Sequence, residues 1–338
     1  MRAYQLEAFG SVEGIALRDR PDPQPGPHDI IVRLHAASLN RRDLMILNRT
    51  YPLPARPEVV PLSDGAGEVI RIGSAVARFK VGDRVTGSYF PKWRTGVLES
   101  DAVDQLGCTV DGMAADTVRL DEQWAVALPA HLSWEEGACL SCAAVTAWSS
   151  LFGGTPLQPG RTVLILGSGD VALFAVQFAR LAGLRVIATT SSDVKAGSLL
   201  ALGAHEVVNY QATPAWGEAV RELTRHQGAD LVVETMGPPT IEQSLVAAAR
   251  HSEIALLIWK SERQQEVVLP AGAYGPKLVN LRRLFVGPRS ALEAVVRAIA
   301  LHRLRPVIDH VFDFAELHAA YRHLESTARF GKVVLRCR

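Results

Sequence analysis

The residues whose spacing points most clearly to chemistry lie near the middle of the chain. Gly167, Gly169 and Ala172 form a GxGxxA pattern after an apolar run at 162–166. The first glycine permits a tight turn, the second lets the backbone approach a pyrophosphate, and the alanine lets a helix pack close to the strand. The pattern predicts a dinucleotide-binding loop, and the alternative is a tight turn in another kind of α/β protein. The predicted loop residues are Gly167, Ser168, Gly169, Asp170 and Val171.

Asp170 places a carboxylate inside this loop, where an anion is expected to bind. We expect its side chain to cap the N-terminus of the following helix and to point away from the anion. The alternative is that Asp170 weakens binding of the cofactor.

The residues after the next β-like run, 185–189, bear on the choice of cofactor. An enzyme that prefers NAD has an acidic residue near this point for the ribose 2′-hydroxyl. Here the run is followed by Thr190, Ser191 and Ser192, and Asp193 comes slightly later. These hydroxyls and Lys195 can hold a 2′-phosphate, which favours NADPH over NADH. The alternative is that Lys195 is a solvated residue of the next helix.

The elements around the loop predict a parallel sheet. Short apolar runs alternate with helical patterns, which is typical of strands covered on both faces by helices. We therefore expect an α/β fold with a doubly wound Rossmann sheet. The predicted strands are 162–166, 185–189, 206–209, 230–234 and 254–258, and the predicted helices are 170–182, 198–202 and 240–249.

The first third of the chain has a different pattern. Its short β-like runs, 29–36, 65–72 and 83–86, are separated by glycine and proline, which predicts a compact, barrel-like β domain. The tail holds predicted helices at 291–302 and 314–324 and predicted strands at 307–312 and 332–335, and we expect it to return to this first domain.

Composition limits the classes of partner. The 338 residues include 36 Lys plus Arg and 35 Asp plus Glu, so a net charge of +1 gives no electrostatic case for nucleic acid or an anionic membrane. The N-terminus lacks a signal-peptide core, and no apolar run is long enough to span a bilayer. Four cysteines in a chain of this length do not make a disulfide framework, so we expect a cytoplasmic protein. The expected partner is a small-molecule substrate.

Several stretches together resemble a known family. The chain is similar to zinc-independent medium-chain dehydrogenases/reductases of the quinone-oxidoreductase-like and alcohol-dehydrogenase-like type. The resemblance implies a GroES-like β-barrel catalytic domain from 1–143 and 287–338, a Rossmann domain from 144–286, and a homodimer. The matching stretches are 38–43, 61–69, 79–85, 142–148, 305–309, 330–334 and the glycine loop.

The resemblance also implies roles for single positions. Asn40 and Tyr51 would face the nicotinamide and the substrate. The other positions would hold the cofactor: Thr146 at the nicotinamide, Lys195 and Tyr210 at the adenosine 2′-phosphate, Gly237 and Gly287 along its path, and Lys332 near its phosphates.

Zinc is not expected. The positions that match the zinc ligands of metal-dependent relatives hold Asn40, Ser63 with Asp64, and Cys142, whereas a tetrahedral site needs three protein ligands. The region of the structural-zinc lobe, 89–116, has only Cys108. Cys139 and Cys142 form a CxxC pair without a second pair, and we expect two buried, small apolar residues on a helix.

These features predict an NADPH-dependent reductase of a conjugated carbonyl or quinone. Asn40 or Tyr51 would stabilise the substrate oxygen, and Tyr51 or water would supply the proton. Alternatively, Tyr51 is an aromatic wall residue and Asn40 organises the backbone. The other functions left open are zinc-free alcohol oxidation and a redox-silent scaffold for a reaction such as cyclisation. Asp170 and the bulky residues at 258–260, where the family has glycine, motivate the scaffold.

Overall fold

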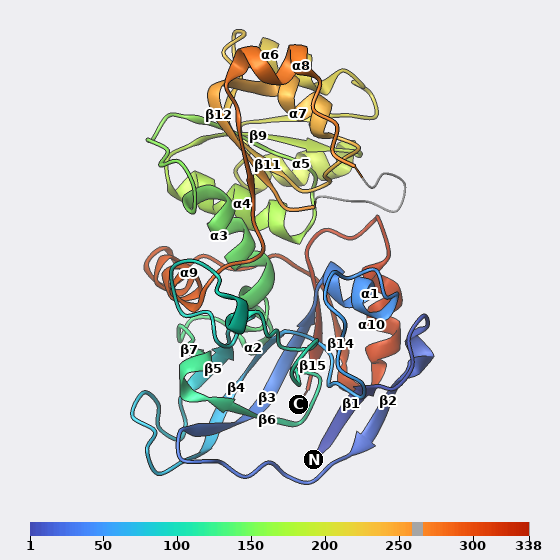
Figure 1. Ribbon diagram of the computed structural model, residues 1–338, viewed down its shortest axis with the longest axis vertical. Helices are drawn as coiled ribbons and strands as arrows, with labels where there is room; N and C mark the ends of the chain where they lie inside the picture. The colour runs from blue at the N-terminus through green and yellow to red at the C-terminus, as the bar shows by residue number, and fades with distance from the viewer. Residues whose placement is uncertain (259–265, 338) are drawn as a thin grey trace. The chain divides into compact units, whose positions relative to one another are not determined.

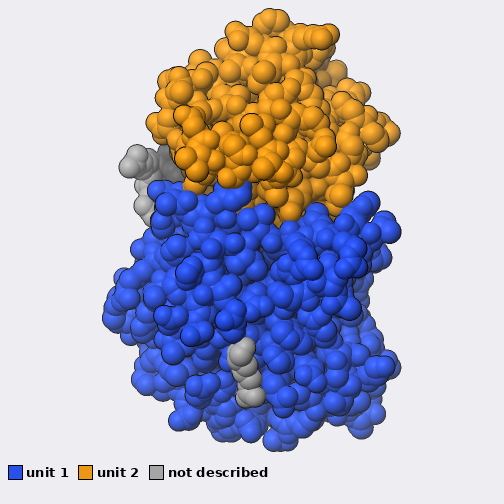
Figure 2. All heavy atoms as spheres, turned by 180° about the vertical axis from the view of Figure 1, so that it is seen from behind, with its two compact units in different colours: residues 1–145, 287–338 blue, residues 146–286 orange. Residues whose placement is uncertain are grey.

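The structure is a computed structural model that describes residues 1–258 and 266–337. The chain forms two compact units (Figure 2). Unit 1 comprises Met1–Val145 and Gly287–Arg338, and unit 2 comprises Thr146–Val286. No helix in the described part of the chain is long and apolar enough to cross a membrane.

Unit 2 contains a six-stranded sheet in which every pair of neighbours is parallel. The spatial order is β10-β9-β8-β11-β12-β13, so the chain moves outward from β8 in one direction and then starts again beside β8 in the other. This is the doubly wound Rossmann order, and it confirms the predicted fold class. The strands are β8 (Thr162–Ile165), β9 (Arg185–Thr190), β10 (Glu206–Asn209), β11 (Ala229–Glu234), β12 (Ala248–Leu256) and β13 (Asn280–Arg283).

The helices of unit 2 pack their apolar residues against this sheet. Leu164, Ile187 and Val232 project from the central strands into a core shared with Trp216 and Leu245 of the helices. The helices are α3 (Val145–Phe152), α4 (Asp170–Leu181), α5 (Asp193–Leu202), α6 (Trp216–Leu223), α7 (Ile241–Ala247) and α8 (Ala271–Tyr274).

Unit 1 is built on a mixed β-sheet with strand order β14-β15-β3-β4-β5-β7, and β6 also pairs with β3. The C-terminal strand β15 runs antiparallel to β3 and parallel to β14, so the tail lies in the same sheet as the first part of the chain (Figure 1). These strands are β3 (Asp29–Leu39), β4 (Asp64–Ile72), β5 (Arg84–Gly87), β6 (Thr117–Asp121), β7 (Ala125–Ala127), β14 (Ile308–Asp313) and β15 (Lys332–Arg336).

Smaller elements complete unit 1. A two-stranded ribbon pairs β1 with β2, and a core of Ile30, Leu34 and Val333 packs beneath α10. The remaining elements are β1 (Arg2–Leu6), β2 (Ile15–Asp19), α1 (Arg41–Leu47), α2 (Trp134–Gly137), α9 (Arg289–His302) and α10 (Leu317–Leu324).

Two predicted boundaries in unit 2 are wrong. The helix expected at 240–249 ends at Ala247, because Ala248 pairs with Ala229 and begins β12. Ala248 and Ala249 favour a helix by propensity, and pairing in the buried sheet overrides that preference. The helix expected at 198–202 begins at Asp193, because the Ser192 side chain accepts a hydrogen bond from the Lys195 N–H and caps it there.

Gly67 allows β4 to pack against β3. A Cβ at this position would lie 2.2 Å from the carbonyl oxygen of Arg33, which the strand pairing holds in place. Gly67→Ala should therefore lower the free energy of unfolding by roughly 1 to 3 kcal/mol. A Cβ on Gly197, inside α5, would meet no heavy atom within 4 Å.

Gly197→Ala is the matched control and should raise the free energy of unfolding by about 0.5 to 1 kcal/mol. Denaturant unfolding of both variants measures the difference. A Gly67→Ala protein as stable as the wild type would contradict the close approach of β3 and β4.

Candidate active site

The glycine loop connects β8 to α4 and leaves open space in front of the helix. Gly167 has φ +80°, in the left-handed region that favours glycine. A Cβ on Gly169 would meet no heavy atom within 4 Å. Because α4 begins directly after Gly169, its free N–H groups face this space. The geometry fits a pyrophosphate, which needs both close backbone approach and N–H donors.

Asp170 does not hold the N-cap position of this helix, where we expected it. Gly169 occupies the N-cap position with extended backbone, and Asp170 is the first helical residue. Glycine is an acceptable N-cap, and a carboxylate in the first turn interacts favourably with the helix dipole. Asp170 therefore adds negative charge to the first turn, next to the loop.

Side-chain hydrogen bonds tie the loop to the neighbouring strand ends. The Gly167 N–H donates to the Thr189 hydroxyl oxygen at 3.1 Å, and the Thr235 hydroxyl donates to the carbonyl oxygen of Leu166 at 2.8 Å. Thr189 belongs to β9, and Thr235 follows β11. The loop is thus fixed at the carboxyl end of the sheet, where the strand order reverses and where such sheets bind ligands.

A buried carboxylate that the sequence analysis missed shapes the adjacent loop. Glu234 has no solvent exposure and accepts hydrogen bonds from the N–H groups of Met236 and Gly237 and from the hydroxyls of Thr240 and Ser244. Burial raises the pKa of this carboxyl, and the four donors partly offset that rise. The signal in the sequence was a lone acidic residue at the end of an apolar run.

Gly237 lies at the turn that Glu234 organises. Its φ is +80°, and a Cβ there would lie 2.2 Å from the carbonyl oxygen of Ile258. Only glycine fits this position. Trp259 and Lys260, the bulky residues noted in the sequence, lie outside the described residues.

The predicted 2′-phosphate residues gather at the ends of two adjacent strands. Asn209 of β10 is in register with Thr190 of β9, and the Tyr210 N–H donates to the Thr190 carbonyl oxygen at 2.9 Å. The Thr190 hydroxyl is buried and has no hydrogen-bond partner among the described residues. Ser191 is exposed, and Lys195 is half-buried in the first turn of α5.

Asp193 is the acidic residue that follows β9, and its carboxylate already accepts a hydrogen bond. The Asn209 side-chain N–H donates to its carboxylate at 2.7 Å. Asp193 is also the first residue of α5, where its charge suits the helix dipole.

Thr146 is the first residue of unit 2, and Gly287 is the first residue of unit 1 after unit 2 ends. Thr146 is buried in α3, and its carbonyl oxygen accepts a hydrogen bond from the Ser150 hydroxyl at 2.7 Å. Gly287 is buried in unit 1 just before α9. Their predicted contacts with the cofactor stay predictions.

A buried polar cluster in unit 1 joins the start of α1 to β15. The Lys332 ammonium donates to the side-chain oxygen of Asn40 at 2.6 Å and to the carbonyl oxygen of Leu39 at 2.7 Å. It lies 4.0 Å from the carboxylate of Asp64, and both side chains are essentially unexposed. The Asp64 carboxylate also accepts hydrogen bonds from the Ser63 hydroxyl and the Cys142 N–H.

These residues do not fit a metal ion. Three of the positions that match zinc ligands in metal-dependent relatives converge here, but they supply an amide, a carboxylate and a thiol beside an ammonium group. Burial raises the pKa of the Cys142 thiol, so the protein does not favour the thiolate that zinc requires. Within residues 1–258 and 266–337, no group of three His, Cys, Asp or Glu side chains is placed to hold a metal ion.

The Tyr51 hydroxyl belongs to a second network beside this cluster. It donates to the side-chain oxygen of Gln105 at 2.6 Å and lies 2.5 Å from the Tyr89 hydroxyl. Burial raises the pKa of Tyr51 to about 12, so the phenol stays neutral near pH 7. The Arg42 guanidinium lies over both tyrosine rings and donates to the carbonyl oxygen of Leu106.

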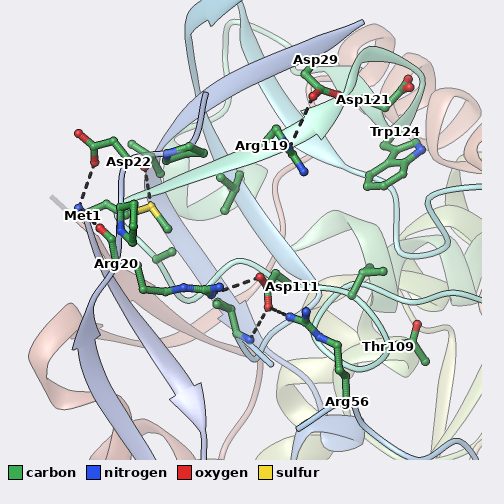
Figure 3. Close-up of a pocket in the computed structure, with 18 residues that line it drawn as sticks. Met1, Arg20, Asp22, Asp29, Arg56, Thr109, Asp111, Arg119, Asp121 and Trp124 are labelled. Carbon is green, nitrogen blue, oxygen red and sulfur yellow. Dashed lines mark hydrogen bonds and ion pairs between the residues drawn. The ribbon is translucent and has the colours of Figure 1, made fainter. Parts of the chain in front are cut away.

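The pocket in Figure 3 is a different place in unit 1. It has a volume of about 640 Å³, and its 18 lining residues do not include Asn40, Tyr51 or Lys332. Figure 3 shows its charges turned toward one another: Arg20 and Arg56 both reach Asp111, and Arg119 reaches Asp29. Because these charges are already paired, this pocket offers no set of free groups for catalysis.

Comparison with known proteins identifies the family. The family model "Alcohol dehydrogenase GroES-like domain" matches residues 26–130, and "Zinc-binding dehydrogenase" matches residues 171–301. A zinc-type alcohol dehydrogenase-like protein of Schizosaccharomyces pombe is 39% identical over 315 residues, which covers 92% of this chain and 91% of that protein.

Two further relatives agree. A quinone oxidoreductase of Pseudomonas aeruginosa is 33% identical over 249 residues, covering 73% of this chain and 70% of its own. The crystal structure of an NAD-dependent alcohol dehydrogenase has a TM-score of 0.91 and 33% identity, with all of both chains covered. The chain belongs to the medium-chain dehydrogenase/reductase superfamily. This member is an oxidoreductase that uses a pyridine nucleotide, which confirms the prediction from the glycine loop.

Asp43, next to the polar cluster, makes stability depend on pH. Burial raises the pKa of this carboxyl to about 6, partly offset by Arg42. The folded protein therefore binds a proton more tightly than the unfolded chain, and stability should fall as pH rises from about 4 to about 6. Asp43→Asn should remove this fall, which is on the order of 3 kcal/mol, while keeping an acceptor for the Asn40 N–H.

Denaturant unfolding between pH 4 and pH 7 measures the effect. Asp101→Asn, at an exposed aspartate of the same unit, is the control and should keep the wild-type pH dependence. Parallel curves for the wild type and Asp43→Asn would contradict the raised pKa.

Proposed function

We propose that this protein is a zinc-independent, NADPH-dependent reductase of a conjugated carbonyl compound or quinone. The observation that carries the proposal is the buried pair of Asn40 and Lys332, hydrogen-bonded at 2.6 Å where metal-dependent relatives hold zinc. A conjugated carbonyl suits such a site, because delocalisation of charge onto oxygen makes reduction less dependent on a Lewis acid. Oxidation of a simple alcohol is harder without a metal ion, because the negative charge on its oxygen is not delocalised.

The cofactor would be held by unit 2. The open space at Gly169 and the start of α4 would take the pyrophosphate, and Gly237 would leave room along its path. Bound reduced nicotinamide supplies a hydride, and the protein contributes orientation and exclusion of water. In this proposal Thr146 contacts the nicotinamide.

The preference for NADPH is argued from the ends of β9 and β10. Ser191, Ser192, Lys195 and Tyr210 would surround a 2′-phosphate, and the hydrogen bond from Asn209 keeps the Asp193 carboxylate engaged elsewhere. Lys195 would supply the positive charge. One relative of known structure is NAD-dependent, so the preference has to be measured on this chain.

Asn40 is the proposed donor to the substrate oxygen. Its side-chain nitrogen is buried and has no hydrogen-bond partner in the described part of the chain. A fixed N–H directed at an oxygen that gains negative charge is an efficient form of stabilisation. The Tyr51 hydroxyl is already bonded to Gln105, so we assign Tyr51 to the wall of the site and the final proton to water.

We also propose a homodimer. Strand β13 is an edge of the six-stranded sheet, and an edge strand offers unpaired backbone groups to a second copy. Sedimentation at several protein concentrations tests this directly.

Lys195→Glu should weaken NADPH binding by about 10-fold to 100-fold and leave NADH binding nearly unchanged, because it reverses the charge beside the 2′-phosphate. Calorimetric titration of both nucleotides measures the two dissociation constants. Lys80→Glu, an exposed lysine of unit 1, is the charge-matched control. An unchanged NADPH affinity in Lys195→Glu would refute the 2′-phosphate assignment.

Gly169→Val tests the nucleotide site itself. The added side chain would extend into the space reserved for the pyrophosphate, so both nucleotides should bind more weakly by at least about 10-fold. Thermal stability should change little, because a Cβ here meets no neighbour within 4 Å. Wild-type protein that binds neither nucleotide would refute the proposed reductase.

Asn40 and Tyr51 should differ in their effect on reduction of a conjugated ketone. Asn40→Ala should lower kcat by about 100-fold to 1,000-fold, because it removes the donor to the oxygen. Tyr51→Phe should lower kcat by less than about 5-fold, because water supplies the proton. Steady-state kinetics with NADPH compares them, and a larger loss in Tyr51→Phe would reassign the proton donor to Tyr51.

A further inference from the structure

Lys332 is a fully buried lysine at the start of the C-terminal strand. It is the first residue of β15, and its neighbour Val333 is in register with Leu39 of β3, directly before Asn40. Its side chain is 1% exposed. A buried ammonium costs several kcal/mol unless it is compensated. The compensation here comes from two oxygen acceptors and the unexposed carboxylate of Asp64.

The ammonium also determines which way the Asn40 amide points. An ammonium group can only donate hydrogen bonds, so the atom of Asn40 at 2.6 Å from Lys332 must be the amide oxygen. The amide nitrogen is therefore directed to the other side. The orientation of the Asn40 amide therefore follows from the fact that an ammonium group has no hydrogen-bond acceptor.

The backbone of Asn40 is held on both sides by Asp43. Its N–H donates to the Asp43 carboxylate at 2.7 Å, and its carbonyl oxygen accepts from the Asp43 N–H at 2.9 Å. The side-chain nitrogen is buried without a partner among the residues that the structure describes. An unsatisfied buried donor destabilises the protein, so a ligand that accepts this hydrogen bond would recover that free energy.

We propose that Lys332 is the positioning residue of the reducing site, holding the Asn40 amide so that its N–H, and never its oxygen, meets the carbonyl oxygen of the substrate. The inference rests on the proposed function. The ammonium polarises the amide through the Asn40 oxygen, and such chains of hydrogen bonds strengthen one another. The charge thus acts through the amide on an oxygen that a zinc ion would contact directly.

The test compares three substitutions. Lys332→Met keeps an unbranched side chain of similar length but removes the charge and the donor, so kcat for a conjugated ketone should fall by about 30-fold to 100-fold while KM changes by less than about 3-fold. Lys332→Arg keeps a donor and should recover most of the loss. The double variant should have the same kcat as Asn40→Ala alone, because Lys332 has no amide to position once Asn40 is removed.

Lys277→Met is the matched control. Lys277 is a half-buried lysine of unit 2, and its ammonium donates to the carbonyl oxygens of Leu245, Val246 and Ala248 at the end of α7. This substitution should lower thermal stability and leave kcat unchanged. If Lys332→Met behaves in the same way, or if its loss of kcat is additive with that of Asn40→Ala, the positioning role is overturned.

A second measurement does not depend on turnover. Neutron diffraction from wild-type crystals in D₂O locates the deuterons of Lys332 and Asn40. Three deuterons on the Lys332 nitrogen, with the Asn40 oxygen facing it, support the proposal. An Asn40 nitrogen that faces Lys332 overturns it. If the wild type reduces no conjugated carbonyl with either nucleotide, the proposed function fails, while the diffraction result still decides the orientation.

Discussion

The antiparallel pairing of β15 with β3 is the constraint on which unit 1 depends. It joins segments almost 300 residues apart in the chain and places Val333 opposite Leu39 and Val334 opposite Ser38. On the other side of β3, Ser38 pairs with Asp64 of β4. Three adjacent strands therefore bring a lysine, an amide and a carboxylate to one point inside the protein. Because a shift of one residue would reverse every side chain on β15, the apolar residues of that strand also fix the position of Lys332.

The two units build their candidate sites in different ways. In unit 2 the proposed nucleotide site would be made mainly of backbone: a left-handed glycine, a helix N-terminus and a turn whose N–H groups are held by Glu234. In unit 1 the site is made of buried side chains that compensate one another. Removal of one charge would leave its partner uncompensated, so these residues depend on one another more strongly than those of the loop.

This difference explains what could be predicted from the sequence. The signals for the strand, the turn at Gly167 and Gly169 and the helix follow one another directly in the sequence. This strand–loop–helix unit was therefore predicted correctly. The resemblance placed Lys332 near the cofactor phosphates, and that contact stays a prediction. Its hydrogen bond to Asn40 depends on strand register between the two ends of the chain, which no local pattern reveals. Glu234 was missed because an acidic residue in an apolar run gives no sign of the donors that will surround it.

The donor set in unit 1 also limits the chemistry that the site can support. A zinc ion contacts the substrate oxygen and carries two charges, whereas the Lys332 ammonium carries one and acts through the Asn40 amide. The stabilisation of a localised alkoxide would therefore be smaller here. A substrate that spreads the new charge over a conjugated system needs less help from the protein. A single polarised amide N–H is then sufficient, provided that its direction is fixed, and the buried lysine is the group that fixes it.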